Sequence, residues 1–496
     1  MTITRWVLAD QLGEHFHEDA AHLVIIEAKD LFRKTRYHRQ KAHLVLSAMR
    51  HLAAERPESA TYIRADTFAE GLATIDGPLE VVAPHSRSAT AVVQLVQEHG
   101  RDLSVLPARG FITSETEFQS WVAERGKRRL LLEDWYRSVR VSHEILIEDG
   151  EPAGGRWNFD EDNRQPPPRG AVTLGLPEPW LPVEDDIDRQ VRQDLDAWES
   201  EGIEFFGADG PRMFPITPDE ARRALADFVE HRLPKFGPYE DALLSEDWLM
   251  AHSGLSVPMN LGVLHPREVV RTAEEAWSKG LVPIASVEGF IRQILGWREY
   301  IWHLYWHFGP LYVDSSNVLS ADEPLPQWFS DAKSEDVTAH CLSWALEQVH
   351  DKGWTHHIVR LMILGNWALQ RGYDPAEMTR WFQRTFVDGY PWVMAANTVG
   401  MALFADGGQM STKPYASGGS YINKMTNLCS GCRYKPTVRV GSDACPFTAG
   451  YWNFLHVNQE RLSGNHRMSM AYAGLRKLAD RDALIVQEAE RGNSAP

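Results

Sequence analysis

Three of the four cysteines in this chain of 496 residues stand close together, at Cys429, Cys432 and Cys445, and Pro446 follows the last of them. The fourth, Cys341, lies far upstream. A C-x2-C pair followed by a third cysteine and a proline is typical of a metal site with thiolate ligands, and four cysteines suffice for one closed site. Zinc and a [4Fe-4S] cluster both accept four thiolates. The spacing therefore leaves both open, together with buried cysteines that hold no metal.

The length of the chain makes disulfides unnecessary for its stability, because a chain this long normally forms two or more domains with a large core. No apolar run reaches the roughly 18 residues that span a bilayer, and residues 1–12 form a short strand pattern rather than a charged leader. We therefore expect a monomeric, cytoplasmic protein that does not bind membranes. The net charge of −17 argues against a surface that binds nucleic acid everywhere, but it allows a local basic groove.

Short apolar runs in residues 1–130 alternate with helical patterns, which predicts an α/β domain with a Rossmann-like parallel sheet. The expected elements are strands at Arg5–Ala9, His22–Ile26, Tyr62–Arg64, Leu79–Ala83 and Leu103–Leu106, with a helix between Lys34 and Ala53. Ligands of such sheets bind at the carboxyl ends of the strands, where Asp10, Gln11 and Glu27 are expected. No G-x-G-x-x-G motif follows the first strand, so we expect a ligand other than NAD. An acidic strand end that only caps a helix is the alternative.

Residues 131–204 differ in character and predict an ordered connector between two domains. Within it, Gly154–Pro168 mixes turn formers, amides and a rigid proline run, and loops of this length inside compact proteins tend to be functional. Residues 205–490 have the pattern of a mainly α-helical domain. The expected helices are Pro218–Arg232, Pro266–Lys279, Val287–Trp306, Ala339–His350, His356–Gln370 and Pro375–Phe386.

The stretch Val287–Tyr300 carries the densest pattern after the cysteines. Its apolar positions form one stripe of a helix, whereas Glu288, Arg292 and Glu299 recur at helical spacing along another face. Two glycines leave one side of this helix bare, so that another helix or a ligand can approach closely. An ion pair between Glu288 and Arg292 is the alternative that needs no ligand.

This stretch, together with His356–Met362, Asp388, Trp392 and Asn397, resembles the photolyase and cryptochrome family. The connector Gly154–Pro166, the segment Gly407–Tyr421 and all four cysteine positions are similar to its bacterial iron-sulfur branch, which comprises the prokaryotic (6-4) photolyases and related bacterial cryptochromes. The resemblance covers nearly the whole chain, from Asp10-Gln11-Leu12 to Gly464–Arg467.

The resemblance implies three cofactors. FAD would lie bent in the helical domain, against Tyr239, His252, Ser253, Leu255, Ser256, Glu288, Gln293 and Arg298, with Arg360 and Asp388 as an ion pair over the isoalloxazine and Asn397 facing flavin N5. Cys341, Cys429, Cys432 and Cys445 would ligate a [4Fe-4S] cluster rather than zinc. An antenna pigment, 6,7-dimethyl-8-ribityllumazine, would bind in the N-terminal domain near Asp10, Gln11 and Glu27.

By the same resemblance the protein is a photolyase that reverses (6-4) pyrimidine-pyrimidone photoproducts in UV-damaged DNA, by electron transfer from photoexcited reduced FAD. Such a lesion is too bulky to react while it is stacked, so it must leave the duplex. Repair needs a proton donor, and histidine is suited because its pKa lies near working pH. His357 is the first candidate and His356 the second, while Tyr415 and Tyr421 match tyrosines that contact the lesion.

Photoreduction of FAD in this branch uses aromatic residues that lead to the surface. Trp381 matches one of them, and Trp328 is the expected second relay. Two positions depart from the family's pattern, because Phe382 replaces a frequent tyrosine and Met394 replaces an acid of a close relative. The electron path and the choice of lesion therefore need not be those of the best-known members.

Two other classes of function compete with repair. A cryptochrome-type blue-light photoreceptor would keep the cofactors and lose the lesion pocket, and the acidic net charge favours it mildly. The two histidines and two tyrosines named above favour repair instead. A zinc-stabilised helical binding protein without light chemistry would require the flavin motifs to be accidental, and it would be colourless when purified.

Overall fold

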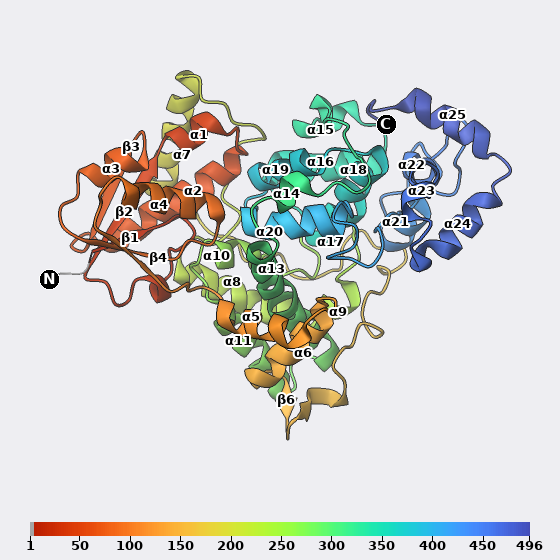
Figure 1. Ribbon diagram of the computed structural model, residues 1–496. Coiled ribbons are helices and arrows are strands. Elements are labelled where there is room, and N and C mark those ends of the chain that lie inside the picture. Colours follow the sequence, from red (N-terminus) through yellow and green to blue (C-terminus); the bar gives the residue numbers. More distant parts are fainter. Residues whose placement is uncertain (1–3) are drawn as a thin grey trace.

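The computed structural model describes residues 4–496 (Figure 1). The N-terminal part contains a five-stranded parallel sheet in the order β3-β2-β1-β4-β5. Its strands are β1 (Thr4–Val7), β2 (His22–Ala28), β3 (Ala60–Ala65), β4 (Leu79–Val82) and β5 (Leu103–Leu106). The central strands are apolar on both faces, as in Val24, Ile25 and Val81, which are fully buried. The predicted strands and the parallel sheet are confirmed.

The helix expected between Lys34 and Ala53 is present but begins later, at Arg39. A separate short helix, α1 (Asp30–Lys34), ends where it was expected to start, and α2 (Arg39–Glu55) begins after an extended turn. His38 caps α2, because its side chain accepts a hydrogen bond from the Gln40 N–H at 3.1 Å. The His38 N–H also donates to the Arg384 carbonyl at 3.0 Å, so this turn is held by the helical part of the chain. The remaining helices around the sheet are α3 (Phe68–Ala73) and α4 (Arg87–Glu98).

The chain after β5 leaves the sheet and joins the helical part. In Figure 1, α5 (Glu115–Arg125) and α6 (Leu132–Ser142) lie among the later helices below the centre of the molecule. Phe118 on α5 stacks on His303 with 4.7 Å between the ring centroids. The division of the chain at residues 130 and 204 stays a prediction.

The connector is ordered and runs along the helical part. A small hairpin, β6 (Ile147–Glu148) and β7 (Glu151–Pro152), is followed by irregular chain up to α7 (Asp186–Ser200), which packs against α2. The Phe159 N–H donates to the Glu288 carboxylate at 3.0 Å, and the Arg164 and Gln165 N–H groups donate to the carbonyls of Gly237 and Pro238 at 3.1 and 2.7 Å. Backbone hydrogen bonds therefore fix its path.

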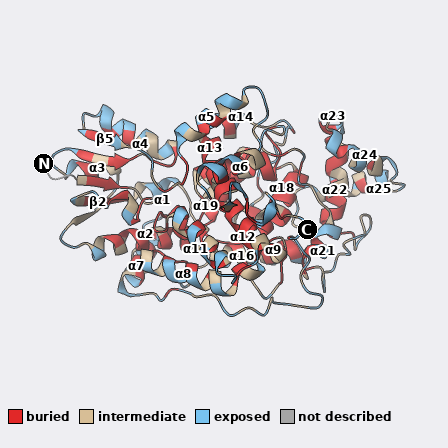
Figure 2. Cartoon of the chain, turned by 90° about the horizontal axis from the view of Figure 1, so that it is seen from below, coloured by how far each residue is buried: buried red, intermediate tan, exposed pale blue. Residues whose placement is uncertain are grey.

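The rest of the chain is helical, and the buried residues concentrate in its central helices (Figure 2). The six predicted helices are present, with ends shifted by a few residues. The helices are α8 (Pro218–His231), α9 (Leu233–Tyr239), α10 (Ser256–Asn260), α11 (Pro266–Ser278), α12 (Ile284–Ile291), α13 (Glu299–His307), α14 (Tyr312–Ser315), α15 (Gln327–Ser330), α16 (His340–Lys352), α17 (His357–Val359), α18 (Asn366–Arg371), α19 (Pro375–Thr385), α20 (Pro391–Ala395), α21 (Gly419–Met425), α22 (Pro446–Val457), α23 (Gln459–Leu462), α24 (Ser469–Arg476) and α25 (Arg481–Arg491). None of the helices in residues 4–496 combines the length and the apolarity needed to cross a bilayer.

Two of the expected continuous helices are interrupted by π-helical turns. The segment η3 (Arg292–Arg298) separates α12 from α13, and η5 (Arg360–Gly365) separates α17 from α18. A further π-helical segment, η6 (Ala396–Ala402), follows α20. Each contains a residue predicted to contact the flavin, and π-helical turns are frequent at functional sites.

Glu299 ties the chain after β5 to the central helix. One carboxylate oxygen accepts hydrogen bonds from the Ile112 and Thr113 N–H groups, both at 2.9 Å, and from the Thr113 hydroxyl at 2.8 Å. The side chain is fully buried, and Arg298 balances its charge at 3.3 Å. A buried carboxylate with this many donors cannot be replaced without leaving polar groups unpaired.

Replacing Glu299 with glutamine should lower the free energy of unfolding by about 2–3 kcal/mol, because the amide oxygen can keep the three donors but the amide N–H group then faces the buried Arg298 guanidinium, whose charge loses its partner. Urea unfolding followed by circular dichroism measures the loss. Glu124→Gln, an exposed change on α5, should shift the free energy of unfolding by less than about 0.5 kcal/mol. Similar losses for the two variants would contradict the role of Glu299.

Candidate functional site

An ion pair between Arg360 and Asp388 lies at the centre of the helical part. The two guanidinium nitrogens meet the two carboxylate oxygens at 2.9 and 3.1 Å. The Ser256 hydroxyl donates to the same carboxylate at 2.7 Å, and the Asn260 amide donates to the Asp388 carbonyl at 3.0 Å. The pair therefore joins η5, the turn after α19 and α10, and its bidentate geometry fixes the orientation of both side chains.

The Arg360 side chain is held on two further sides. Its Nε donates to the Thr355 carbonyl at 2.8 Å, and its guanidinium lies 4.1 Å from the centroid of the Phe386 ring. Both neighbours belong to segments that flank the ion pair, which leaves Arg360 little freedom to turn.

His252 and His356 stack beside this pair, with 4.3 Å between the ring centroids and 16° between the planes. Burial, followed by the charges of His357 and Arg360, lowers the pKa of His252 to about 3, and burial lowers the pKa of His356 well below its usual value. Within residues 4–496, both ring nitrogens of His356, Nε2 of His252 and the Thr355 hydroxyl lack a hydrogen-bond partner. Buried polar atoms without partners indicate that a polar ligand completes them.

His357 differs from its neighbour because its side chain is exposed. Its pKa is nevertheless lowered to about 4, by desolvation and then by the positive charges of Arg360 and Arg164. At neutral pH the imidazole is therefore uncharged, which differs from the expectation of a pKa near working pH.

Tyr415 and Tyr421 are 46% and 40% exposed and can contact a large ligand. They belong to a segment with unusual charge. Residues 407–442 contain five lysines and arginines and no aspartate or glutamate, in a chain whose net charge is −17. Lys413 and Lys424 are exposed there. This segment is the strongest candidate for the predicted local basic groove.

Several predicted flavin contacts have their polar groups engaged within the chain. One Glu288 oxygen accepts from the Phe159 N–H. The other lies 3.3 Å from Arg292 Nε, in the ion pair weighed as the alternative, and has no hydrogen-bond partner within residues 4–496. Gln293 and Asn397 donate to carbonyls of their own helical segments at 3.1 and 2.8 Å.

The other predicted contacts flank the site. Tyr239 is partly buried under the connector. The Ser253 hydroxyl accepts from the N–H of the buried Leu255 at 3.2 Å, so the two form a tight turn before α10. Arg298 lies over the rings of Phe111 and Trp392 at 4.3 and 5.3 Å, and burial lowers its pKa to about 10.

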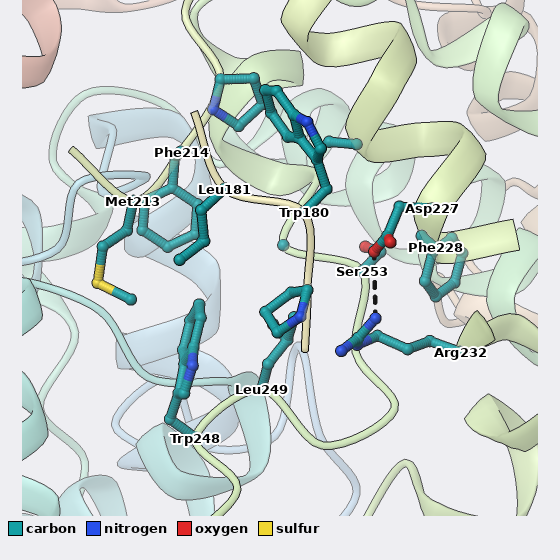
Figure 3. A pocket seen from close by; sticks show the side chains of 14 residues that line it. Trp180, Leu181, Met213, Phe214, Asp227, Phe228, Arg232, Trp248, Leu249 and Ser253 are labelled. Atoms are coloured by element: carbon teal, nitrogen blue, oxygen red, sulfur yellow. Dashed lines mark hydrogen bonds and ion pairs between the residues drawn. The ribbon is translucent and has the colours of Figure 1, made fainter. Parts of the chain in front are cut away.

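A small pocket opens on the outer side of this turn (Figure 3). It has about 390 Å³ of atom-free space, solvent at its mouth included, and Trp180 and Leu181 of the connector form one wall. Arg232 and Asp227 pair at 3.1 Å on another wall. The pocket shows that the connector covers the turn at Ser253 without filling the space beside it.

The predicted antenna residues lie at the carboxyl ends of β1 and β2. Gln11 donates to the carbonyls of Val82 and Ala83, both at 3.2 Å, and Asp10 lies 3.4 Å from His85. Glu27 is fully engaged, because its carboxylate accepts from Arg50, Tyr62 and Arg64. Asp10 and Gln11 lie just beyond the carboxyl end of the central strand β1, whereas Glu27 faces these three side chains.

The two tryptophans expected to relay electrons are joined by one ring. Trp381 is buried. Its ring centroid lies 5.9 Å from that of Phe386, which is beside the ion pair, and 4.9 Å from that of Phe329. Phe329 lies 5.7 Å from Trp328, which is half-buried. The rings form a continuous series from the ion pair toward the surface.

The four cysteines lie near one another. Burial raises the pKa of the Cys341 thiol well above its usual value, and the neighbouring thiols of Cys445, Cys429 and Cys432 raise it further. Burial also raises the pKa of Cys429 to about 12. In the part of the chain that the structure describes, no three cysteine sulfurs lie within 4.8 Å of one another. Burial and the neighbouring thiols oppose ionisation of these cysteines, which a bound cation would favour.

Three residues of this region carried no signal in the sequence. Thr355 and Asn260 look like ordinary loop and helix residues, and Lys41 looks like one more basic residue of an amphipathic helix. Only the fold brings Asn260 and Lys41 to the turn that holds Asp388, and Thr355 to the side chain of Arg360.

The comparisons with known proteins agree with this arrangement. Residues 5–208 match the family model of the deoxyribodipyrimidine photo-lyase-related proteins. A (6-4) photolyase of Agrobacterium fabrum (strain C58 / ATCC 33970) is 37% identical over 461 residues, which cover 90% of this chain and 88% of the relative.

Two solved structures share the fold. A bacterial class III photolyase from Agrobacterium tumefaciens has a TM-score of 0.57 at 15% identity and covers 96% of this chain and 98% of its own. A cryptochrome of Synechocystis sp. PCC6803 has a TM-score of 0.53 at 13% identity, with 80% and 82% covered. The predicted fold class, a parallel-sheet domain followed by a mainly α-helical one, is confirmed. The identity to the (6-4) photolyase, over nearly the full length of both proteins, shows that the chain belongs to the photolyase and cryptochrome family.

Proposed function

We propose that this protein is a light-dependent DNA repair enzyme that reverses (6-4) pyrimidine-pyrimidone photoproducts. The observation that carries the proposal is the 37% identity to a relative named (6-4) photolyase, across 88% of that relative. The position of the exposed His357, close enough to the Arg360–Asp388 pair for both charges to act on its pKa, supports it. A photoreceptor without repair activity would need no accessible histidine there.

FAD, the cofactor of the family, fits the centre of the helical part. The unpartnered atoms of His252, Thr355 and His356 are suited to its phosphates and ribityl hydroxyls, and Ser256 stands beside them. Arg360 and Asp388 would orient the ring. When bound and reduced, FAD absorbs blue light and supplies one electron to the lesion.

The chain's own residues would bind the extruded lesion and hold a proton for it. A neutral His357 can donate one N–H hydrogen bond to the hydroxyl group that must move between the two pyrimidines. The negative phosphates of bound DNA would raise the pKa of the imidazole, so that His357 takes up a proton from water, which it can then donate to the lesion. Tyr415 and Tyr421 would contact the lesion as it leaves the duplex.

Lys413 and Lys424 would pair with phosphates of the damaged strand. Exposed cations in a segment free of acidic residues attract DNA although the whole protein is acidic. This arrangement confines binding to one surface.

The cysteine group would hold a [4Fe-4S] cluster. In a tetrahedral zinc site the sulfurs lie only about 3.8 Å apart, as follows from the Zn–S bond length. The absence of three sulfurs within 4.8 Å among residues 4–496 favours a larger group over a single zinc ion. The four-thiolate donor set suits such a cluster.

The antenna, 6,7-dimethyl-8-ribityllumazine, would bind at the carboxyl edge of the sheet. Asp10 and the Gln11 carbonyl oxygen can bond a ribityl chain or a ring, because the hydrogen bonds of Gln11 within the chain use its Nε2. Glu27 would act through Arg50 and Arg64. Trp381 and Trp328 would carry electrons between the flavin and the surface.

Replacing His357 with alanine should abolish repair of an oligonucleotide with one (6-4) photoproduct and leave FAD bound, because the side chain is exposed and makes no hydrogen bond within residues 4–496 that the variant would lose. Chromatography after blue-light exposure measures repair, and the flavin absorption measures occupancy. Retained repair would refute the assignment. A wild-type protein with bound flavin and no repair would favour the photoreceptor.

Replacing both Lys413 and Lys424 with glutamate should weaken binding to damaged DNA and reduce the slope of log K against log salt by about 2, since each lost phosphate contact removes about 0.9. Fluorescence anisotropy at several salt concentrations tests this. Lys34→Glu, on an exposed helix of the sheet domain, is the control and should leave the slope unchanged.

Iron analysis should find about four iron atoms and no zinc per chain. Cys341→Ser should remove the brown absorption, whereas Ser430→Ala, between two of the ligands, should keep it. Stoichiometric zinc in the purified protein would contradict the proposed cluster.

A further inference from the structure

Lys41 is a buried lysine that crosses from the sheet domain to the flavin side of the molecule. It lies on α2 and is 8% exposed. Its Nζ donates to the Gln383 carbonyl at 2.6 Å, to the Phe386 carbonyl at 3.2 Å and to the Gly389 carbonyl. A single ammonium therefore uses all three of its donors on one short stretch of backbone.

This stretch is the one that presents Asp388. Gln383 lies in the last turn of α19, whose final carbonyls have no partner in the helix, and a cation is favoured at that end. The turn is tight, because a Cβ on Gly389 would lie 2.6 Å from the Phe382 carbonyl oxygen and 2.9 Å from that of Phe386. The carbonyls of Gln383, Phe386 and Gly389 converge on Lys41 Nζ, whose positive charge offsets the repulsion between their oxygen atoms.

The surroundings of Lys41 make its charge consequential. Asp388 and Arg360 are the charged groups that act on it, and the rings of Tyr37 and Tyr390 lie 5.8 and 5.2 Å from Nζ. Burial lowers the pKa of Lys41 to about 7, Asp388 raises it and Arg360 lowers it. The ammonium thus loses its proton as pH rises through neutrality, and a neutral amine can donate to only two of the three carbonyls.

We propose that Lys41 is a positioning residue that fixes the Phe386–Gly389 turn, so that Asp388 meets Arg360 and Ser256, and that its charge acts on the flavin through this turn. The effect on the flavin rests on the proposed function. The effect on the turn does not, because it follows from the three hydrogen bonds alone.

The test compares wild type with Lys41→Met, Lys41→Arg and, as a control, Lys34→Met on the exposed end of α1. The flavin midpoint potential is measured from pH 5.5 to 9 for each holoprotein. Hydrogen exchange of the peptide that covers residues 383–390 is measured in the same samples and in apoprotein.

Wild type should have a higher potential than Lys41→Met at low pH, because a positive charge favours the added electron, and the difference should vanish above neutral pH. Lys41→Arg stays charged, so its flavin midpoint potential should remain higher than that of Lys41→Met at every pH. Exchange in residues 383–390 should be at least about tenfold faster in Lys41→Met than in wild type, with or without flavin, because three hydrogen bonds to a charged donor are lost. Lys34→Met should match wild type.

Two results would overturn the proposal. One is a potential difference between wild type and Lys41→Met that does not change with pH, and the other is unchanged exchange in residues 383–390. If wild type binds no flavin, the proposed cofactor is wrong, and the exchange of the apoprotein still decides the role of Lys41 in the turn.

Discussion

The bidentate contact between Arg360 and Asp388 is the interaction on which the site depends. Asp388 is buried and the Arg360 side chain is only 13% exposed, so losing either partner would leave the charge of the other unpaired inside the protein. Two segments carry the pair, η5 and the turn after α19, and Ser256 joins them from α10, more than 100 residues upstream. The ion pair therefore holds Arg360, Asp388 and Ser256 together even without a ligand, and these are residues that a ligand would contact.

Polar contacts of the same kind join the sheet domain to the helical part. Glu299 accepts hydrogen bonds from the chain that follows β5, and Lys41 donates hydrogen bonds to the turn that follows α19. Apolar surfaces alone would allow the two parts to slide against each other, whereas a buried charge with several fixed partners accepts one register only. An antenna at the sheet edge and a flavin in the helices would need such a fixed relation.

The sequence predicted the strands and helices well, because their patterns are local. The apolar runs of β2 and β4, and proline at the start of α8 and α19, are readable residue by residue. The partners of buried polar side chains could not be predicted from the sequence, because they come from distant parts of the chain. Glu27 and Glu288 could each have faced a ligand, and only tertiary contacts with Arg50 or Phe159 show that they are engaged within the protein. The cysteine group was recognisable because cysteine is rare in this chain.

The π-helical turns show why the flavin region resists prediction by period. An inserted residue shifts the faces of the helix beyond it by about 100°, so a stripe read at the α-helical period no longer points the same way. In η5 the shift begins at Arg360 itself, and η3 ends at Arg298. Wider turns of this kind have poorer helical geometry and persist where other contacts compensate. Side chains such as Arg360 offset the poorer helical geometry of η5. Its guanidinium donates hydrogen bonds to the Asp388 carboxylate and to the Thr355 carbonyl.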